Sequence, residues 1–579
     1  MDKVNITIDG IKVSVPADYT VLEAAREAGI NIPTLCYLKD VQQIGACRMC
    51  LVEGGGRGLQ ASCVLPVTDG MNIKTNTPAI RKARRINLEL LLSNHNRECT
   101  GCVRNRNCEL QQLCNEYGVR DFPYDGPKTE TAIDDISPSI VRDNSKCILC
   151  RRCIAMCNKI QEIGAINVAK RGMNTQVGCI FDKPLIDSPC IACGQCIVAC
   201  PTGALHEKDS TKAVWDALGN PDLHVVVQPA PAVRAALGEE FGLPVGTRVT
   251  GKLAASLRRL GFAKVFDTDF GADLTIIEEG TELIGRLTNN GVLPMITSCS
   301  PGWIKYCETF YPEFIPNLST CKSPHEMTGA LIKSYYAEKN NIDPKKIFAV
   351  SVMPCTAKKF EASRPELSNN GLQDVDAVIT TRELAAMIRT AGIDFNRLPD
   401  EDFDDLMGES TGAAVIFGAT GGVMEAALRT VYEIVTGKVL ESVDFAAVRG
   451  IDGVKEAEVD LNGKKVRVAV AHGTGNASSL LESIKSGEKQ YDFIEIMGCP
   501  GGCVTGGGQP IINATDLSYI DPKELRAKAL YSEDEAKTFR KSHQNESVKK
   551  LYEEYLGEPN GHKSHELLHT HYIPRPKYK

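Results

Sequence analysis

Three separate stretches of the chain place cysteine within two residues of glycine or proline. The richest, residues 495–510, reads EIMGCPGGCVTGGGQP, with Cys499 and Cys503 four positions apart among six glycines. That much glycine would weaken a helix or strand, but it lets the backbone fold closely around a bulky group. A glycine-rich turn with two incidental buried thiols is the alternative, because free cysteine is often buried. The composition of the stretch favours a bound cofactor.

Two further cysteine-bearing loops follow short apolar runs. Residues 293–303 read LPMITSCSPGW and carry Cys299, and residues 348–361 read FAVSVMPCTAKKFE and carry Cys355. Each run reads as a strand ended by proline, with the cysteine at its carboxyl end. Open α/β sheets gather their ligands at that edge. We therefore expect the three loops to converge on one site.

The three stretches resemble the signatures of the iron-iron hydrogenases, TSCCPxW, MPCxxKxxE and ExMxCxxGCxxGGGxP. All three occur in order with one departure, and the resemblance extends over nearly the whole chain, closest to the long clostridial-type enzymes. It implies an H-cluster, which is a 4Fe-4S cubane joined through one cysteine sulfur to a two-iron centre carrying carbonyl, cyanide and an azadithiolate bridge. By the matching motifs Cys355, Cys499 and Cys503 are ligands, with Cys503 the bridging one.

The resemblance also implies roles for the side chains around the H-cluster. Lys358 would donate to a cyanide as a compact ammonium, and Met353 and Met497 would pack soft sulfur against the two-iron centre. Three residues would line the same pocket with their backbone: Ala230, Pro231 and Gly418. Groups that both donate and accept protons would form a route to the cluster: Cys299, Glu279, Ser319, Glu282 and Arg286. Without the resemblance, the two glutamates would read as a solvated helix face.

The departure is Ser300, where the family has a second cysteine that ligates the cubane. Serine holds its proton far more tightly than cysteine, so its binding to iron is weaker and depends on pH. Three outcomes remain open: Ser300 ligates as an alkoxide, Cys299 moves into the ligand position and leaves the proton route, or the cubane is unstable. Two other residues near the pocket also differ: His325 stands where relatives often have glutamine, and Cys321 where they often have alanine.

Length and composition set wider bounds. A chain of 579 residues is too long for one core and suggests about four domains. The net charge of −7 argues against nucleic acid as a partner. Because no apolar stretch is long enough to span a membrane and no secretory or twin-arginine signal opens the sequence, we expect a cytoplasmic protein. In that setting 23 cysteines indicate metal binding or catalysis rather than a disulfide scaffold.

Residues 1–78 form the first predicted domain. Two alternating runs joined by Asp9-Gly10 predict a hairpin, and a helix is predicted over 21–28. Four cysteines then follow with the spacing C-x10-C-x2-C-x12-C: Cys36, Cys47, Cys50 and Cys63. Four thiolates with one close pair suit a 2Fe-2S cluster, whereas structural zinc sites usually use two close pairs. The block resembles plant-type ferredoxins in their complex I variant, which implies a β-grasp fold.

Residues 79–138 form the second predicted domain. Apolar residues recur three and four apart from residue 78 onward and predict an amphipathic helix. The helix leads to a set spaced H-x3-C-x2-C-x5-C: His95, Cys99, Cys102 and Cys108. The spacing resembles the 4Fe-4S module with one histidine and three cysteine ligands found in complex I and in long hydrogenases. A lone histidine is more often structural, but imidazole is a competent iron ligand.

Residues 139–208 contain an internal repeat, C-x2-C-x2-C-x3-C written twice. This is the run of bacterial two-cluster ferredoxins, in which the fourth cysteine of each run ligates the other cluster. One cubane is therefore predicted on Cys147, Cys150, Cys153 and Cys200. The second is predicted on Cys190, Cys193, Cys196 and Cys157. Several such centres on one chain would carry single electrons toward the site of chemistry.

Residues 209–579 alternate strand and helix patterns and predict a large α/β domain. The candidate strands are 224–227, 347–352, 466–471 and 492–496, and helices are predicted over 251–260 and 382–390. The whole chain is thus predicted to be multidomain, α+β and α/β. The C-terminal domain would hold the H-cluster.

The resemblance implies a hydrogenase that interconverts H2 with two protons and two electrons. Its cofactors would be one 2Fe-2S cluster, three accessory 4Fe-4S clusters and the H-cluster, assembled with maturation proteins, and its partner would be ferredoxin. A variant is the catalytic subunit of an electron-bifurcating complex with flavin- and NAD-binding subunits, because such assemblies share the complex I-like domains. From another class, a sensory or electron-transfer subunit is favoured by Ser300. A complex I-type subunit would leave the three converging loops without a purpose.

Overall fold

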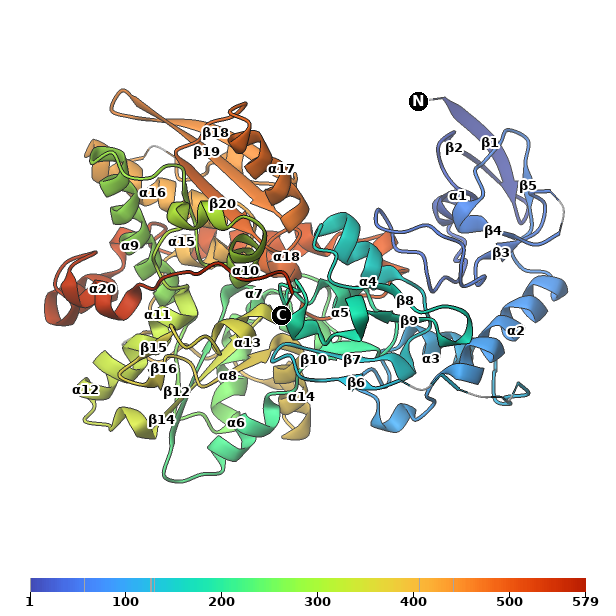
Figure 1. Cartoon of the computed structure of the whole chain (residues 1–579), viewed down its shortest axis with the longest axis horizontal. Coiled ribbons are helices and arrows are strands. Elements are labelled where there is room, and N and C mark those ends of the chain that lie inside the picture. Colours follow the sequence, from blue (N-terminus) through green and yellow to red (C-terminus); the bar gives the residue numbers. More distant parts are fainter. Residues whose placement is uncertain are drawn as a thin grey trace.

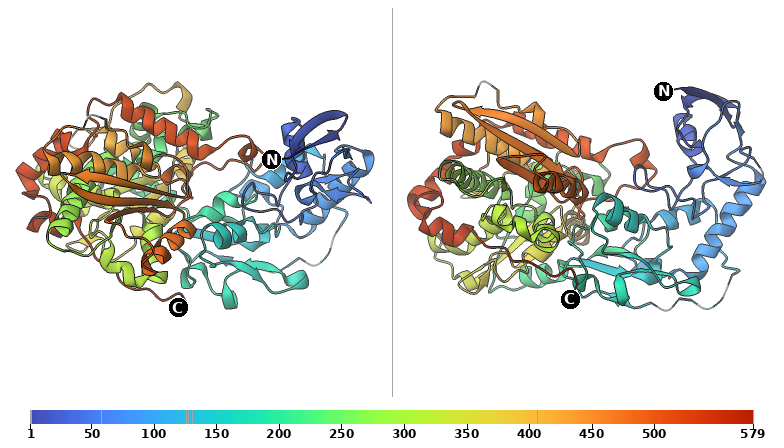
Figure 2. Two further views of the ribbon diagram at one scale, coloured as in Figure 1. Left: turned by 90° about the horizontal axis from the view of Figure 1, so that it is seen from above. Right: turned by 45° about the horizontal axis from the view of Figure 1, so that its top comes forward.

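The computed structural model is elongated, with the N-terminal segments at one end and the large C-terminal domain at the other (Figure 1). It describes residues 2–56, 58–124, 126, 128–129, 131–405, 407–440 and 442–578. Two short helices, α4 (Arg152–Ala155) and α5 (Gln195–Ala199), lie between the two ends in every view (Figures 1 and 2). Among the described residues, no helix has both the length and the apolar character needed to cross a membrane.

The N-terminal lobe begins with the predicted hairpin. Asp9 and Gly10 have φ of 48° and 89°, as a type I′ turn requires. A capping box between Thr20 and Glu23 starts the predicted helix, which packs on the sheet. The lobe contains β1 (Lys3–Ile8), β2 (Ile11–Pro16), α1 (Val21–Glu27), β3 (Leu51–Val52), β4 (Gln60–Ala61) and β5 (Asn72–Ile73). The sheet order is β2-β1-β5, with β5 parallel to β1.

The predicted amphipathic helix is α2 (Pro78–Asn94). It begins where the Thr77 hydroxyl accepts a hydrogen bond from the Ile80 amide, buries Leu88 and Leu92, and ends at His95. Beyond α3 (Glu109–Glu116), a three-stranded sheet of order β10-β7-β6 carries the repeat. Its strands are β6 (Ile133–Asp134), β7 (Ile140–Asp143) and β10 (Leu205–Glu207), and a separate hairpin pairs β8 (Asn167–Ala169) with β9 (Gln176–Gly178). In each half of the repeat the third cysteine lies on a short helix, α4 or α5.

Two four-stranded sheets organise the C-terminal domain, and all four strands predicted there are confirmed. The first has the order β12-β11-β14-β17 and is entirely parallel. The second has the order β13-β20-β19-β18, with only β18 antiparallel. The strands are β11 (His224–Pro229), β12 (Lys264–Val265), β13 (Met295–Ile296), β14 (Ile347–Met353), β17 (Ala377–Thr380), β18 (Val454–Leu461), β19 (Lys464–His472) and β20 (Phe493–Met497). A separate hairpin pairs β15 (Ser368–Asn369) with β16 (Leu372–Gln373).

Helices cover both sheets. They are α6 (Thr211–Leu218), α7 (Pro231–Arg234), α8 (Thr250–Leu260), α9 (Thr268–Thr288), α10 (Pro301–Phe310), α11 (Pro324–Leu331), α12 (Ala337–Lys339), α13 (Ala357–Glu361), α14 (Thr381–Thr390), α15 (Gly412–Val415), α16 (Gly422–Thr436), α17 (Thr474–Lys485), α18 (Pro522–Ala536), α19 (Glu546–Leu551) and α20 (His562–Leu568). The predicted helices over 251–260 and 382–390 are α8 and α14. Beyond α20 the C-terminal segment, red in Figure 1, crosses the domain toward α10. There the Arg575 amide donates to the Glu308 carbonyl.

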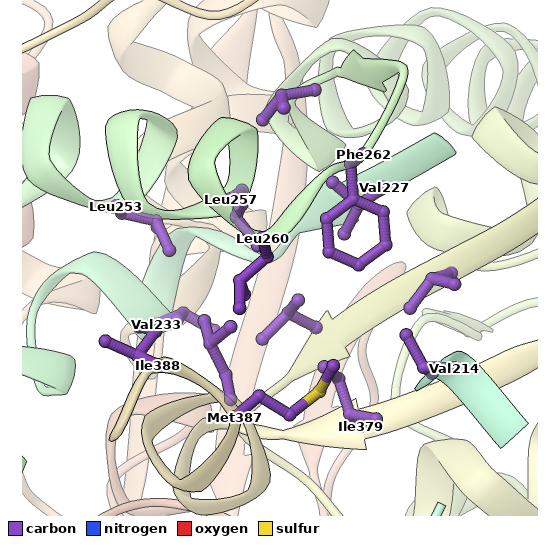
Figure 3. Close-up of a cluster of buried hydrophobic side chains, with 14 of the residues drawn as sticks. Val214, Val227, Val233, Leu253, Leu257, Leu260, Phe262, Ile379, Met387 and Ile388 are labelled. Atoms are coloured by element: carbon purple, nitrogen blue, oxygen red, sulfur yellow. The ribbon is translucent and has the colours of Figure 1, made fainter. Parts of the chain in front are cut away.

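The core of the first sheet fixes the strands whose carboxyl ends approach the site. Leu257 of α8, Val227 of β11 and Ile379 of β17 lie in one cluster with no exposed surface (Figure 3). Met387 of α14 closes the same cluster from the other side. Burying side chains of this size stabilises the domain by about 1.5–3 kcal/mol each. The strand ends are therefore held by packing rather than by the loops that follow them.

Candidate active site and iron-sulfur sites

The three predicted loops meet at one cavity. Cys355 follows β14, Cys499 and Cys503 follow β20, and Cys299 follows β13, and all four line the cavity. The interaction between Cys355 and Cys499 lowers the pKa of Cys355 to about 7 and raises the pKa of Cys499. This is expected for two adjacent thiols that share one proton. Both sheets thus deliver thiols from their carboxyl ends to the same space.

Glycine is required where the loop that carries Cys499 and Cys503 closes on this cavity. Gly502 has φ of +98°, and a Cβ there would lie 2.7 Å from the Thr420 backbone nitrogen. At Gly506 a Cβ would lie 2.2 Å from the Pro354 carbonyl oxygen. Any side chain would force this loop away from the loop that carries Cys355. The glycines noted in the sequence therefore serve close backbone approach.

The residues expected around the two-iron centre line the same cavity: Ala230, Pro231, Met353, Lys358, Gly418 and Met497. The Lys358 ammonium donates to the Glu361 carboxylate at 2.6 Å and to the Ser323 hydroxyl at 2.8 Å. It is therefore held at the cavity wall as a fixed positive charge. The sequence reasoning had not named either partner, although Glu361 is the last residue of the MPCxxKxxE motif.

Ser300 and Cys299 are neighbours in sequence but have different surroundings. The Ser300 hydroxyl accepts a hydrogen bond of 3.0 Å from the Gly498 amide, next to Cys499. Burial, and then the charges of Glu279 and Cys503, raise the pKa of Cys299. Cys299 therefore lies toward the glutamate of the expected proton route, and Ser300 lies toward the loop that carries Cys499.

This donor set fits the H-cluster. Four soft thiols and one hydroxyl line a cavity whose other walls are mostly apolar, with one fixed ammonium. A side chain at position 502 or 506 would collide with neighbouring backbone, so glycine at both positions lets the loop fold closely around a bulky group. When bound, that cofactor would supply the redox chemistry at iron.

Of the expected proton-route residues, Ser319, Glu282 and Arg286 are joined by hydrogen bonds between α9 and the segment after α10. The Ser319 hydroxyl donates to Glu282 at 2.8 Å, and the Arg286 guanidinium donates to the other oxygen of Glu282 at 2.5 Å. Burial and then the charge of Glu282 raise the pKa of Glu279 to about 8. Neither carboxylate oxygen of Glu279 has a hydrogen-bond partner within the standard distance among the described residues, although Ser319 is near enough to lower its pKa. Glu279 thus stands between Cys299 and Ser319.

The four cysteines of the N-terminal lobe come together. The Cys47 amide donates to the Cys36 sulfur at 3.5 Å, and proximity to Cys36 lowers the pKa of Cys47 to about 6. In the same way, Cys63 lowers the pKa of Cys50 to about 7. Repulsion from Cys47 in turn raises the pKa of Cys50 slightly, so the two pairs adjoin. These are four thiols around one point, as a 2Fe-2S cluster needs.

The histidine and three cysteines after α2 also lie near the repeat. Burial is the main cause that lowers the pKa of His95 to about 4, so its imidazole is neutral and able to ligate. The His95 Nδ1 atom is buried and has no hydrogen-bond partner among the described residues. Cys99, Cys102 and Cys108 follow, and a Cβ at Gly203 would lie 2.6 Å from the Cys102 sulfur. A neutral imidazole with an unpartnered Nδ1 atom, four positions before the first of these thiols in the sequence, is consistent with a metal ligand.

The repeat brings together the two cysteine sets that the sequence predicted. Cys147, Cys150, Cys153 and Cys200 line one small cavity. Burial raises the pKa of Cys193 to about 12, with further contributions from Cys190 and Cys157, so Cys157 lies with the second set. Burial raises the pKa of Cys196 in the second set, and Cys200 of the first set adds to the rise. The two sets are therefore neighbours. The grouping of Cys200 with the first set and of Cys157 with the second is consistent with the predicted exchange of fourth cysteines.

Direct contacts join these sites in series. The Gln42 amide donates to the carbonyls of Cys36 and Cys150, at 2.8 and 2.7 Å, and so links the N-terminal lobe to the repeat. The Arg104 guanidinium donates to the Cys200 carbonyl at 3.3 Å. At the other end, Cys193 raises the pKa of Cys499. The second set of the repeat therefore adjoins the cavity.

The domain contact at that junction is equally close. The Thr356 hydroxyl, next to Cys355, donates to the Ala192 carbonyl at 2.7 Å. The Gln161 amide donates to the Gly498 carbonyl at 2.8 Å. A Cβ at Gly194 would lie 2.9 Å from the Gly507 Cα. The ferredoxin-like repeat therefore docks on the loops that hold the cavity thiols.

Comparison with known proteins agrees with this layout. Residues 223–507 match the iron only hydrogenase large subunit, C-terminal domain, and residues 521–575 match the iron hydrogenase small subunit. Residues 1–78 match a 2Fe-2S iron-sulfur cluster binding domain. Residues 84–123 match the NADH-ubiquinone oxidoreductase-G iron-sulfur binding region, and 137–206 match the ferredoxin-like domain of NADH-quinone oxidoreductase subunit 3. The small-subunit region is a division that sequence reasoning had not made.

Full-length relatives give the same result. The chain is 51% identical to the NADP-reducing hydrogenase subunit HndD of Solidesulfovibrio fructosivorans, over 100% of both chains. It is 46% identical to iron hydrogenase 1 of Clostridium pasteurianum, over 98% of this chain and 99% of that one. The FeFe-hydrogenase HydA1 of Chlamydomonas reinhardtii matches with a TM-score of 0.57 and 45% identity, over 63% of this chain and 99% of that one. The chain belongs to the iron-only hydrogenase family.

Proposed function

We propose that the protein interconverts H2 with two protons and two electrons in the cavity formed by the three loops. The observation that carries the proposal is the meeting of Cys355, Cys499 and Cys503 beside a fixed Lys358 ammonium. The apolar walls exclude water, which strengthens the electrostatic effect of that ammonium on a bound anionic ligand. Lys358 would donate to a cyanide of the H-cluster, and Met353 and Met497 would pack against it.

The decisive experiment for this proposal is infrared spectroscopy of the protein after maturation, paired with an activity assay. Iron-bound carbonyl and cyanide give bands in a region where protein does not absorb. We expect those bands together with H2 evolution from reduced viologen. Matured protein with neither the bands nor H2 evolution would instead support the second candidate, a sensory or electron-transfer subunit, which the replacement of a ligand cysteine by Ser300 favours.

We infer that Ser300 completes the ligand set of the cubane and that Cys299 remains on the proton route. The Gly498 amide holds the Ser300 hydroxyl beside Cys499, whereas Cys299 faces Glu279 and Cys503. Electron paramagnetic resonance of protein loaded with the cubane alone separates the alternatives. Ser300→Ala should convert the four-iron signal to a three-iron signal, and Ser300→Cys should keep four irons. If Cys299→Ala loses the iron instead, Cys299 is the ligand.

The proton route would run from Cys299 through Glu279 and Ser319 to Glu282 and Arg286. Glu279 can hold a proton near neutral pH because its pKa is about 8. The Ser319 hydroxyl can accept a proton from Glu279 while it passes its own to Glu282, to which it already donates at 2.8 Å. At the outer end the Arg286 guanidinium donates to Glu282 at 2.5 Å.

Electrons would enter at the N-terminal lobe and the histidine-containing site and pass through the two cubanes of the repeat. The Gln42 and Arg104 contacts support this order, and so does the proximity of Cys193 to Cys499. One 2Fe-2S cluster, three accessory 4Fe-4S clusters and the H-cluster would be bound in all. Iron and sulfide analysis of the reconstituted chain tests that number.

The electron partner is proposed to be ferredoxin or the flavin- and NAD-binding subunits of a bifurcating complex in the cytoplasm. One full-length relative is named as a subunit of an NADP-reducing hydrogenase, which supports a complex. Purification under native conditions distinguishes the two. Copurification of flavin-containing subunits would favour the complex, and a single chain that exchanges electrons directly with ferredoxin would favour the simpler enzyme.

A further inference from the structure

Three potential metal ligands from distant parts of the chain meet beside the proposed proton route. Glu282 lies on α9, Cys321 follows Ser319 by two positions, and His569 lies at the end of α20. One ligand atom from each lies within 4.8 Å of the other two. Cys321 is fully buried and His569 is 7% exposed. The cluster is separate from every cysteine set described above.

The backbone holds two of these residues together. Cys321 and His569 form an antiparallel β-bridge. The Lys322 amide donates to the Leu568 carbonyl and the Thr570 amide to the Thr320 carbonyl, both at 2.8 Å. The C-terminal segment is therefore fixed against residues 320–322. The backbone of two of the three residues is thus already in place for binding an ion, and the side chains have to move.

Glu282 presents one oxygen to the cluster and the other to Arg286. The Arg286 guanidinium is on Oε1 at 2.5 Å, and the Cys321 sulfur lies 4.0 Å from Oε2. Glu278 adds a second carboxylate, 3.2 Å from the His569 Nε2 atom. The oxygen that faces the thiol is thus not the one that the guanidinium neutralises.

A second buried cluster provides a contrast. His325, Glu326 and Glu361 also lie close together. There the Lys358 ammonium is 2.6 Å from Glu361 Oε2, the same oxygen that lies 2.7 Å from the His325 ring. The Lys358 ammonium already neutralises the Glu361 carboxylate, so the His325 cluster is not a comparable metal site.

We propose that Glu282, Cys321 and His569 bind a thiophilic divalent cation, for which Zn²⁺ is the best match. Zinc takes sulfur, imidazole nitrogen and carboxylate oxygen in tetrahedral sites, with bonds of about 2.0–2.3 Å. Ligand atoms in such a site lie roughly 3.3–3.8 Å apart by that geometry, so the present separations need to close by about 1 Å. Glu278 or water would supply the fourth ligand.

Binding has two chemical consequences. Burial, and then the charges of Glu282, Glu279 and Glu278, raise the pKa of the Cys321 thiol, so the thiol is protonated without metal and binding releases that proton to solvent. The ion would also compete for the Glu282 oxygen to which the Ser319 hydroxyl donates. Zinc would therefore interrupt the proton route, a consequence that rests on the proposed function.

The binding test uses the full chain with its clusters loaded, equilibrated with Zn²⁺ and then desalted. Wild type should retain one zinc more than Cys321→Ala, and its zinc K-edge absorption should show a sulfur neighbour at about 2.3 Å. His569→Gln should weaken binding by on the order of tenfold or more. Cys307→Ala is the matched control, because that buried thiol donates instead to the Tyr311 carbonyl. Equal zinc in wild type and Cys321→Ala, or a zinc shell without sulfur, would overturn the site.

The activity test is separate. Zn²⁺ should slow viologen-driven H2 evolution by wild type several-fold and leave Cys321→Ala at its own zinc-free rate. Zinc that binds as described but does not slow wild type would refute the blocked proton route and leave the metal site established. A protein without hydrogenase activity would still give the zinc count, so failure of the proposed function is distinguishable from failure of this inference.

Discussion

The raised pKa of Glu279 gives the sharpest prediction about the proton route. Burial and then the charge of Glu282 move it from the ordinary 4.5 to about 8. At pH 7 a carboxyl with the ordinary value is protonated in about one molecule in 300, whereas at a pKa of about 8 roughly ten in eleven are protonated. The shift therefore changes Glu279 from a group that is almost always ionised into one that carries a transferable proton.

The perturbation is Glu279→Gln, and the assay is an infrared titration of protonated carboxyl groups. In wild type, a carboxyl band that is present at pH 7 should disappear with a midpoint near 8, and the variant should lack that band. Between pH 4.5 and 8 the folded state holds a proton that the unfolded state has lost, so this group's contribution to stability falls as pH rises. The full fall is about 5 kcal/mol, at about 1.4 kcal/mol per pH unit. H2 evolution by the variant should fall by about 10²- to 10⁴-fold.

Glu207→Gln is the matched control for the band. Glu207 is partly buried, and burial alone would raise its pKa, but Arg382 lowers the pKa to about 2. Replacing it should remove no protonated-carboxyl band between pH 5 and 8. A wild-type spectrum in which no carboxyl titrates above pH 6, or a band that persists in Glu279→Gln, would refute the reasoning about this proton.

Three further predictions concern loop packing, electron transfer and the core. Gly502→Ala should prevent loading of the H-cluster, measured by its infrared bands, because the new Cβ would lie 2.7 Å from the Thr420 nitrogen; normal bands would contradict this. Gln42→Leu removes the contact with Cys150 and should slow reduction of the repeat through the 2Fe-2S cluster in stopped-flow absorbance; an unchanged rate would exclude that link. Leu257→Ala should destabilise the C-terminal domain by about 2–5 kcal/mol in denaturant unfolding, and a loss below 1 kcal/mol would mean that the core refills the cavity.

The parts of the fold that the sequence predicted were those with a local physical cause. Asp9-Gly10 specifies its hairpin because both residues accept positive φ. Apolar runs such as 347–352 specify buried parallel strands. The interleaved cysteine sets were predictable because the spacing within each run is short and the exchange of fourth ligands is a property of the two-cluster arrangement.

Long-range contacts could not be predicted in this way. Glu361 and Ser323 fix Lys358, but only Glu361 lies near it in sequence, three positions along the same helix. The Gln42 amide that links two lobes is an ordinary polar residue in the sequence. The C-terminal bridge between Cys321 and His569 joins residues that no periodicity relates. Side-chain partners across domains follow from packing, which a single sequence does not display.

The central claim is that the cavity between the two sheets holds the iron of the H-cluster. Anomalous diffraction at the iron edge from crystals of the matured chain tests it directly. The account predicts iron inside the cavity, within bonding distance of Cys355, Cys499 and Cys503 and facing Ser300. Iron confined to the accessory cysteine sets, with none in this cavity after maturation, would contradict it.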